Sequence, residues 1–408
     1  MDYIFIDCKD RESRVGIVED GNLVEYYIEE EDRHRIVGNI YRGRVNSVLK
    51  GMNASFIDIG EGKNAYLHVK DALSREQILS GERFTIDEVL KAGEDIIVQV
   101  SKEPLGEKGP KVTTNISIPG RYLVLTPPTD DINISRKIND KEEVERLKEI
   151  GRDIQRDNIG IIFRTMAEGV DREILAEEYN TLIDIYKKIE SQKNFLPTPK
   201  LLYRELDLVY RIVRDIFNEK KHKIVVNDRD IYEELLQLDQ YFFHGLEEKL
   251  TLDREFSVEH NTNIQRGISE AFNRKVNLKS GGYIVIDETE ALTAIDVNTG
   301  KYVGSYSFDK TVVNTNMEAT EEIARQVRLR DIGGIIIIDF IDMKNKEDIS
   351  KVINKLSNHF KYDRNKPNIL GITKLGLVEV TRKKIRPTID SRISIKCPTC
   401  NGRGRIKK

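Results

Sequence analysis

The sequence has no long hydrophobic run, and this excludes a helix that crosses a membrane. A membrane-spanning helix needs about 18 or more consecutive apolar residues, whereas the longest run lies around the four isoleucines at 335–338. The first ten residues, MDYIFIDCKD, are acidic and lack the basic start of a signal peptide. We therefore expect a cytoplasmic protein with no membrane segment.

Cysteine is scarce, with only Cys8, Cys397 and Cys400 in 408 residues. The number is odd and two of the three are close in sequence, which makes a disulfide framework implausible. Metal binding or redox chemistry remains for the pair at 397–400. A thioredoxin-like redox motif opens a helix after a strand, but this pair lies in a Gly- and Arg-rich tail, KCPTCNGRGRIKK, so we favour metal binding.

A structural zinc site needs about four thiolate or imidazole ligands, and the pair supplies two of them. Cys8 falls in a predicted N-terminal strand, where a small buried side chain is the better interpretation. The six histidines are scattered, and none has a suitable spacing to the pair. The simplest completion is a second copy of the chain, so the sequence predicts a homodimer in which Cys397 and Cys400 of two chains share one Zn²⁺.

Neither sign of charge is in excess, because 66 Lys and Arg stand against 69 Asp and Glu. The chain as a whole is therefore not attracted to nucleic acid, and any polyanion site must be local. Hydrophobic residues make up 39% of the chain, which excludes disorder. Since single cores stop growing at roughly 250–300 residues, a chain of 408 residues is expected to form several domains.

Strand and helix patterns alternate along the chain and predict a multidomain α/β protein. Short β-type runs between Gly38 and Ser101, separated by Gly-rich turns, are typical of a small barrel, which we interpret as an OB-fold. Amphipathic helices at 141–157 and 171–193 flank the strand IGIIFRT and form an α/β unit. Further helices are expected at 200–218, 229–251, 316–331 and 347–361.

Two predicted strands end in polar side chains that could hold a metal ion. In ALTAIDVNTG, Asp296 and Asn298 are two positions apart and project from the same face of their strand. In GGIIIIDFIDM, four buried-type isoleucines lead into Asp339 and Asp342. One or two carboxylates plus phosphate oxygens are the Mg²⁺ ligands expected for phosphodiester hydrolysis. Spacing does not choose between Asp339 and Asp342, and capping of turns or helices explains these aspartates about equally well.

Three long segments around these aspartates resemble the catalytic domain of the ribonuclease E/G family: SGGYIVIDETEALTAIDVNTGKYVG, NTNMEATEEIARQVRLRDIGGIIIIDFIDM and LGLVEVTRKK. The resemblance implies that Asp296 and Asp342 hold a catalytic Mg²⁺ and that Asn298 supports them by hydrogen bonding. Asp339 is then either structural or a neighbour of the metal ligands that does not bind the ion itself. The resemblance also implies that metal-activated water cleaves single-stranded, A/U-rich RNA to 5′-phosphate and 3′-hydroxyl ends, in RNA processing and mRNA decay. The family is also known for a zinc ion shared between chains.

Residues 43–71 resemble the OB-fold of S1-type RNA-binding domains, in which aromatic side chains stack on bases. The resemblance implies RNA binding by Phe56, Tyr66 and Lys108. Without it, both aromatic residues would more often belong to the barrel core.

The segment IIFRTMAEG places Arg164 and Thr165 just beyond an apolar strand, where a guanidinium group and a hydroxyl could bind a terminal phosphate. The family uses this motif to sense 5′-monophosphorylated RNA, with contacts that match Gly120 and Val124. Where family members often carry arginine, this chain has Lys374. Lysine keeps the positive charge but cannot form the bidentate hydrogen bonds of a guanidinium group.

By the same resemblance, the fold is an RNase H-like domain interrupted by an OB-fold and a 5′-sensor domain, followed by a DNase I-like domain and a zinc-link. The expected bounds are 1–35 and 203–273 (RNase H-like), 36–118 (S1-type OB-fold), 119–202 (5′ sensor), 274–396 (DNase I-like) and 397–408 (zinc-link). We expect the chain to stop there, without the further small domain of longer family members and without a scaffold tail for other decay enzymes.

The alternative function is a non-catalytic RNA-binding or ribosome-assembly factor built from the same barrel and basic loops. Such a binder would not need Asp296, Asn298 and Asp342 together. RNA cleavage that depends on these residues therefore separates the two hypotheses.

Overall fold

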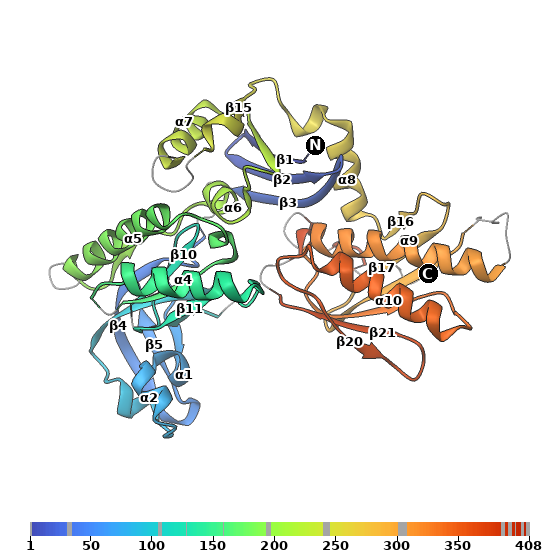
Figure 1. Cartoon of the computed structure of the whole chain (residues 1–408). Coiled ribbons are helices and arrows are strands. Elements are labelled where there is room, and N and C mark those ends of the chain that lie inside the picture. Colours follow the sequence, from blue (N-terminus) through green and yellow to red (C-terminus); the bar gives the residue numbers. More distant parts are fainter. Residues whose placement is uncertain are drawn as a thin grey trace. The chain divides into compact units, whose positions relative to one another are not determined.

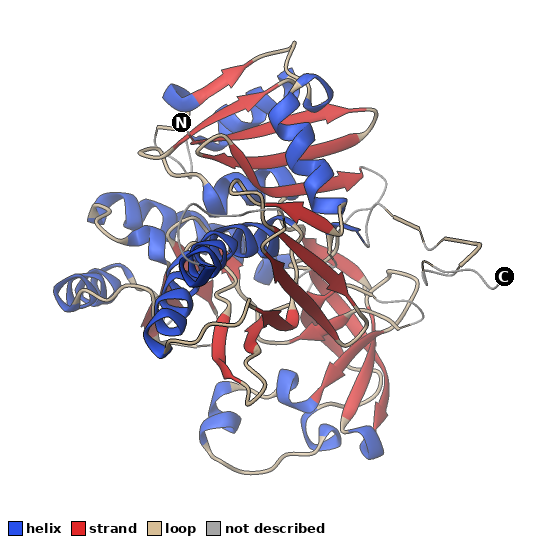
Figure 2. Cartoon of the chain, turned by 90° about the vertical axis from the view of Figure 1, so that its right-hand side faces the viewer, coloured by secondary structure: helices blue, strands red, loops and turns tan. Residues whose placement is uncertain are grey.

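The chain folds into two compact units of mixed α/β structure (Figures 1 and 2). The computed structural model describes residues 2–30, 35–104, 108–127, 129–157, 159–192, 197–239, 245–300, 308–384, 388–390, 394–395, 397–400 and 404. Unit 1 consists of residues 1–29, 220–229 and 250–408, and unit 2 of residues 30–219 and 230–249. None of the helices in the described ranges is long and apolar enough to cross a membrane.

Unit 2 contains a closed barrel of five strands, in the order β4-β5-β6-β8-β7 with β7 pairing back to β4. The strands are β4 (Ile40–Leu49), β5 (Ala54–Asp58), β6 (Ala65–His68), β7 (Asp95–Lys102) and β8 (Lys111–Thr113). Strand β4 closes the barrel by pairing with both β5 and β7. Gly43 in β4 allows this close approach, because a Cβ atom there would lie 2.7 Å from the Ile57 side chain and 2.9 Å from the backbone oxygen of Asp58. The predicted small barrel is thus confirmed.

Short elements connect the barrel strands, and one further strand, β13 (Lys200–Tyr203), pairs with β4. The connecting helices are α1 (Val69–Ala72), α2 (Arg75–Leu79) and α3 (Ile86–Val89). A capping box at Ser74 and Gln77 starts α2.

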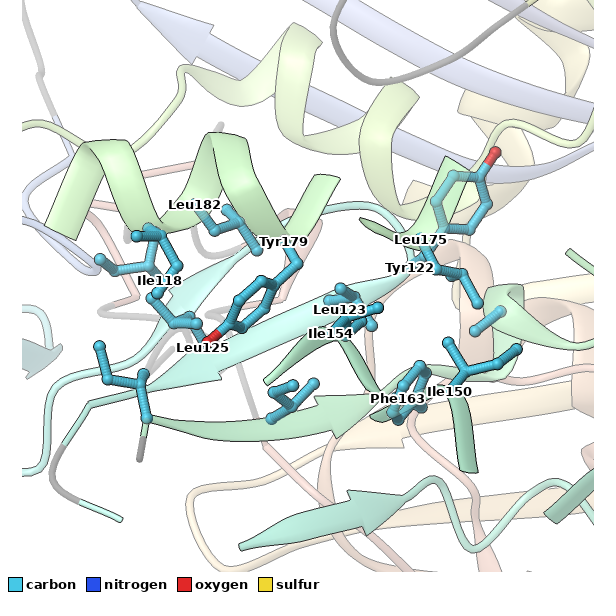
Figure 3. Close-up of a cluster of buried hydrophobic side chains, with 14 of the residues drawn as sticks. Ile118, Tyr122, Leu123, Leu125, Ile150, Ile154, Phe163, Leu175, Tyr179 and Leu182 are labelled. Carbon is cyan, nitrogen blue, oxygen red and sulfur yellow. The ribbon is translucent and has the colours of Figure 1, made fainter. Parts of the chain in front are cut away.

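The rest of unit 2 is built on a four-stranded sheet, in the order β11-β12-β10-β9, that packs against two long helices. The elements are β9 (Ile118–Pro119), β10 (Leu123–Thr126), β11 (Ile132–Ile134), β12 (Gly160–Phe163), α4 (Lys141–Ile154) and α5 (Arg172–Gln192), with α6 (Leu208–Ile216) and α7 (Arg229–Leu238) further along the chain. Figure 3 shows Leu123 and Leu125 of β10 among buried side chains such as Tyr179 and Leu182 of α5. This core fixes the strand ends that carry the predicted phosphate-binding residues.

The first sheet of unit 1 combines strands from the start of the chain with two later strands, at 222–226 and 250–252. Its order is β15-β14-β1-β2-β3, with β1 parallel to β14 and antiparallel to β2. The elements are β1 (Asp2–Lys9), β2 (Glu12–Glu19), β3 (Asn22–Glu30), β14 (His222–Val226), β15 (Leu250–Leu252) and the nearby α8 (Thr262–Phe272). Asp7 in β1 is buried and accepts hydrogen bonds from Asn227 Nδ2 (2.5 Å) and the Val258 N–H (3.0 Å), so its carboxylate is satisfied within the fold.

The second sheet of unit 1 has one covered face and one open face. Its order is β16-β17-β18-β19-β21-β20, and only β18 and β19 are parallel neighbours among these described strands. The elements are β16 (Lys275–Asn277), β17 (Tyr283–Glu288), β18 (Leu292–Asn298), β19 (Gly334–Asp339), β20 (Asn368–Ile372), β21 (Val378–Arg382), α9 (Phe308–Leu329) and α10 (Lys346–Phe360). Ile295, Val297 and Ile338 are buried in the core shared with α9 and α10, whereas Asp296 and Asp339 are exposed.

Three of the predicted helices are partly wrong. The helix expected at 316–331 is α9, which begins at Phe308 and ends at Leu329. In the expected helix 200–218, residues 200–203 form β13 and the helix α6 begins at Leu208. In the expected helix 229–251, α7 ends at Leu238 and β15 begins at Leu250. Both missed strands are only a few residues long, and such short runs are held by pairing to a neighbouring strand, which periodicity does not reveal.

Candidate active site and RNA-binding residues

Asp296 and Asn298 lie on the open face of the second sheet of unit 1, at the end of β18. The Nδ2 atom of Asn298 donates a hydrogen bond of 2.8 Å to Oδ2 of Asp296, while Oδ1 of Asp296 makes no hydrogen bond to a described residue. Asp339 ends β19 and is the direct neighbour of Asp296 in the parallel register. Side chains alternate along a strand with a period of two, so Asp296, Asn298 and Asp339 lie on the same face, at the ends of the two central strands β18 and β19.

Asp342 follows β19 on a turn that a buried asparagine fixes. Asn316 of α9 is fully buried, donates from Nδ2 to the carbonyl oxygen of Ile341 (2.8 Å) and accepts the Ile341 N–H at Oδ1 (3.1 Å). The amide nitrogen and the amide oxygen of Asn316 thus both bind the backbone of Ile341, the residue that precedes Asp342. Asn316 was not predicted, although asparagine in the middle of a helix is unfavourable and indicates a specific contact.

The carboxylates of this site interact with one another. Burial and then the charges of Asp296 and Asp342 raise the pKa of Asp339, so all three lie within electrostatic range. Carboxylate oxygens are hard ligands that suit Mg²⁺, which commonly binds one or two of them and completes its shell with water or phosphate oxygens. The described ranges contain no group of three or more His, Cys, Asp or Glu arranged to hold a metal ion. The carboxylates that this site offers to a Mg²⁺ ion are those of Asp296, Asp339 and Asp342.

Phe56 of β5 and Tyr66 of β6 lie on the outer side of the barrel. They are cross-strand neighbours, with ring centroids 6.0 Å apart in an edge-on arrangement. The ring of His68 continues the row, 6.5 Å from that of Tyr66. Both aromatic rings are half-buried, while their chain neighbours Ile57 and Leu67 are fully buried in the barrel. Phe56 and Tyr66 thus lie outside the barrel core.

Lys108 is exposed and belongs to a segment that runs beside β6. The Tyr66 N–H donates to the carbonyl oxygen of Pro110 (2.7 Å), and Tyr66 is the register partner of Lys111. Gly109 passes so close to Asn64 that a Cβ atom would lie 2.0 Å from the Asn64 backbone oxygen. The backbone around Lys108 is therefore held next to the aromatic row.

Arg164, just after β12 in unit 2, is anchored through one of its nitrogen atoms. Its Nη1 donates to the carbonyl oxygen of Gly120 (2.5 Å) and forms an ion pair with Asp215 of α6 (2.8 Å). Nε and Nη2 make no hydrogen bond to a described residue, and the side chain is 24% exposed. The guanidinium edge that can bind a phosphate with two parallel hydrogen bonds is thus open. The hydroxyl of the next residue, Thr165, lies 2.9 Å from that of Ser135.

Glu178 of α5 holds the turn that supplies Gly120. Its buried carboxylate accepts the N–H groups of Arg121 (2.5 Å), Tyr122 (2.8 Å) and Leu123 (2.7 Å). A Cβ atom at position 120 would lie 2.6 Å from the carboxyl carbon of Glu178, so any larger residue there would displace this carboxylate from its N–H donors. Burial raises the pKa of Glu178, and the three N–H donors oppose the rise. Glu178 was not predicted, because one glutamate among several on an amphipathic helix carries no signal.

The other two residues predicted to sense the 5′ phosphate are Val124 and Lys374. Val124 is half-buried in β10, where it pairs with Ile162 and Pro119. Lys374 is exposed in the turn between β20 and β21. Gly120, Val124, Arg164 and Thr165 therefore belong to unit 2, and Lys374 belongs to unit 1.

Comparison with known proteins identifies the family. A family model described as "Ribonuclease E/G family" matches residues 117–385. The chain belongs to the ribonuclease E/G family. Ribonuclease G of Escherichia coli (strain K12) is 42% identical over 419 residues, which cover 99% of this chain and 84% of that protein. Ribonuclease G of Haemophilus influenzae is 40% identical over 414 residues, with the same coverage. Ribonuclease E of Synechocystis sp. is 38% identical over 379 residues, or 91% of this chain and 55% of that protein.

The matched residues 117–385 of this ribonuclease E/G family member include the carboxylate site and every predicted 5′-phosphate residue. The barrel precedes that range, but the alignments with ribonuclease G cover 99% of the chain and so extend through it. All three candidate sites of this family member thus lie in regions that it shares with named ribonucleases.

The Cys397–Cys400 turn of this family member favours the thiolate form of Cys397. The backbone N–H groups of Cys400 and then Thr399 lower the pKa of the Cys397 thiol, and the Gly404 N–H lies 3.4 Å from Cys400 Sγ. Thiolate is the form of cysteine that binds zinc. Cys8 lies apart from this turn in β1, with its sulfur 3.7 Å from the Ser13 hydroxyl. Most of the predicted zinc-link, including 401–403 and 405–408, falls outside the described residues.

Proposed function

We propose that this endoribonuclease of the ribonuclease E/G family cleaves single-stranded, A/U-rich RNA with Mg²⁺ held by Asp296 and Asp342, in RNA processing and mRNA decay. The observation that carries the proposal is the hydrogen bond from Asn298 to the exposed Asp296, at the end of strand β18. An aspartate that only capped a turn would need no such partner. The buried Asn316 supports the proposal further, because it fixes the turn that carries Asp342.

The chemistry follows from the donor set. When bound, Mg²⁺ lowers the pKa of a coordinated water and offsets negative charge on the phosphate. Asp296 and Asp342 would bind it through their carboxylate oxygens. The Asn298 amide restricts the orientation of Asp296, and Asp339 adds a carboxylate beside the pair without binding the metal. Because no side chain has to attack phosphorus, we expect products with 5′-phosphate and 3′-hydroxyl ends.

Incubation with a 5′-monophosphorylated, A/U-rich oligonucleotide tests this proposal. Internal cleavage is expected with Mg²⁺, none with EDTA, and mass spectrometry should find a 5′-phosphate on each downstream product. Intact RNA in every lane, with RNA still bound, would favour the non-catalytic RNA-binding or ribosome-assembly factor.

The outer side of the barrel is proposed to bind RNA bases on Phe56 and Tyr66 and a phosphate on Lys108. The half-buried aromatic row and the exposed lysine held beside it support this assignment. Base stacking tolerates any sequence, as an enzyme that acts on many transcripts requires.

Tyr66→Ala is expected to weaken binding of single-stranded RNA about tenfold, because one stacked base contributes roughly 1–3 kcal/mol. Fluorescence anisotropy in EDTA measures the dissociation constant without cleavage. Tyr66→Phe keeps the ring and should bind like the wild type. Tyr362→Ala removes a tyrosine that is 70% exposed in unit 1 and serves as the control; equal weakening by both alanine variants would argue against a stacking site.

A preference for 5′-monophosphorylated RNA is proposed for Arg164, Thr165, Gly120 and Val124 of unit 2. The role of Lys374, which belongs to unit 1, stays a prediction from the family resemblance. The proposal for unit 2 is supported by the anchored Nη1 and the open Nε–Nη2 edge of Arg164. The carbonyl oxygen of Gly120 and the carboxylate of Asp215 orient the guanidinium group so that this edge is presented to a ligand.

Arg164→Lys is expected to reduce the preference for 5′-monophosphate over 5′-hydroxyl RNA about tenfold, because lysine keeps the charge but loses the paired hydrogen bonds. The ratio of kcat/KM for two oligonucleotides that differ only at the 5′ end measures the preference. Arg172→Lys alters an exposed arginine of α5 that pairs with Asp153 and is the matched control. A ratio left unchanged by Arg164→Lys would remove Arg164 from the sensor.

We also propose a zinc-linked homodimer in which two chains contribute Cys397 and Cys400. The lowered pKa of the Cys397 thiol supports a thiolate site at this turn. With two thiolates from each chain, four ligands surround one zinc ion, which is the usual number for a structural site.

The domain assignments are proposed as follows. The first sheet of unit 1 is the RNase H-like domain, the barrel is the S1-type OB-fold, the four-stranded sheet is the 5′ sensor, and the second sheet of unit 1 is the DNase I-like domain. The strand order β3-β2-β1-β14-β15, which combines the chain start with the strands at 222–226 and 250–252, supports the first of these assignments. Residues 203–219 and 230–249 fall in unit 2, apart from that sheet.

A further inference from the structure

The open face of the second sheet of unit 1 carries two rows of side chains that cross its strands. The strands β16 and β17 and the helix α9 of this region are labelled in Figure 1. Strand alternation places the members of both rows on the face that carries the proposed metal ligands. The rows are Asn277, Tyr283 and Asn298 in the first, and Lys275, Val285, Asp296 and Asp339 in the second.

Lys275 is the only lysine or arginine in strands β16 to β19, every residue of which is described. Its Nζ lies 3.7 Å from the centroid of the Tyr283 ring. It is exposed and forms no ion pair with any residue of the described ranges, whereas the adjacent Arg274 is paired with Asp287. The charge of Lys275 is therefore available to a ligand.

An RNA strand that reaches this face meets the carboxylates of Asp296, Asp339 and Asp342, which repel its phosphates. A metal ion at the site offsets that repulsion for the phosphate that is cleaved, but the flanking phosphates require other cations. Lys275 lies two strands away from Asp296, a backbone distance of about 10 Å. A flexible four-carbon side chain covers part of that distance, so the ammonium group can reach a flanking nucleotide.

We infer that Lys275 binds the RNA backbone phosphate next to the one that is cleaved, and that the Tyr283 ring holds the lysine ammonium in place. This contact rests on the proposed function, since it assigns a substrate phosphate to the same site. The attraction of an ammonium group to a tyrosine face limits the many rotamers of lysine. Tyr283 is the direct cross-strand neighbour of Asn298. The ring therefore keeps the ammonium group at a fixed distance from the strand end that carries Asp296 and Asn298.

Lys275→Gln tests the contact through the salt dependence of RNA binding. The slope of log Kd against log salt concentration, measured in EDTA on a single-stranded oligonucleotide, should decrease by about 0.7, the contribution of one phosphate on a single strand. With Mg²⁺, KM should rise several-fold while kcat changes less. Lys275→Arg retains the charge and should keep the wild-type slope and KM.

A matched control is Lys361→Gln, which removes an exposed lysine at the end of α10, the helix that packs on the covered face. It should leave the slope and KM unchanged. Tyr283→Phe keeps the ring and should behave like the wild type. Tyr283→Leu removes the ring and should show part of the decrease in slope and of the rise in KM expected for Lys275→Gln.

The outcomes separate this contact from the proposed function. If the wild type cleaves RNA and Lys275→Gln keeps its slope and KM, the contact is disproved while the proposed function stands. An equal change in Lys275→Gln and Lys361→Gln would also disprove it, because it would reflect net charge alone. If the wild type does not cleave RNA with Mg²⁺, the proposed function fails and the contact with it.

Discussion

Asp296→Asn is expected to lower kcat for RNA cleavage at least about a thousandfold, a loss of roughly 4 kcal/mol of transition-state stabilisation. The amide has the size of the carboxylate and can still accept the hydrogen bond that Asn298 donates over 2.8 Å. It lacks the negative charge that a hard cation such as Mg²⁺ requires. Single-turnover cleavage of an end-labelled oligonucleotide at saturating enzyme measures this loss apart from RNA binding.

Two further variants make the result specific. Asp342→Asn should lose about as much activity as Asp296→Asn, because both carboxylates are proposed to bind the metal ion. Asp339→Asn should lose far less, about ten- to a hundredfold, since this carboxylate is proposed to lie next to the metal ligands without binding the ion. RNA binding in EDTA should stay near the wild-type value in all three. Full activity of Asp296→Asn, or an equally deep loss in Asp339→Asn, would contradict the proposed ligand pair.

The carboxylate site was only partly predictable from the sequence. Asp296 and Asn298 share a face because strand side chains alternate with a period of two, and this holds wherever the strand lies. Asp342 follows the end of β19, so its position depends on the turn that Asn316 fixes from 25 residues away. That contact is set by the packing of α9 on the sheet and not by a local pattern. Spacing alone therefore left Asp339 and Asp342 equivalent.

The direction of side chains in the barrel shows a second limit of sequence patterns. Ser55 and Ile57 are fully buried, whereas Phe56 between them is half-buried. A large aromatic residue thus faces outward while a serine faces inward, the reverse of what hydropathy predicts. Without the resemblance to a known RNA-binding domain, the half-buried Phe56 would have been assigned to the core.

Most of the long helices were predicted well because their patterns are strong, although α9 begins eight residues before its predicted start. The helices α4 and α10 begin within a residue or so of the expected positions, since many apolar residues repeat at helical spacing. Strands β13 and β15 were missed because three or four residues carry no periodic signal. Contacts that join distant segments, such as the three N–H groups bound by Glu178, are also invisible to a local pattern.

Cys397→Ser is expected to convert a zinc-linked dimer into a monomer with the 47.0 kDa mass of one chain and to remove zinc. A single substitution removes two of the four ligands, because both chains of a symmetric dimer carry it. Structural zinc sites contribute about 10–16 kcal/mol, so the remaining two thiolates are not expected to hold the ion. Mass photometry and zinc analysis of the same preparation measure both effects, and RNA cleavage should fall together with assembly.

Cys8→Ser is the matched control for this loss, because Cys8 lies in β1 beside Ser13 and is not a proposed ligand. It should keep the dimer, with one zinc for every two chains. A monomeric wild type with one zinc per chain would contradict the shared site, as would a Cys397→Ser variant that retains both zinc and dimer. If chelation of zinc from the wild type separates the chains and re-addition restores dimer and activity together, the metal itself is the link, since the polypeptide is unchanged throughout.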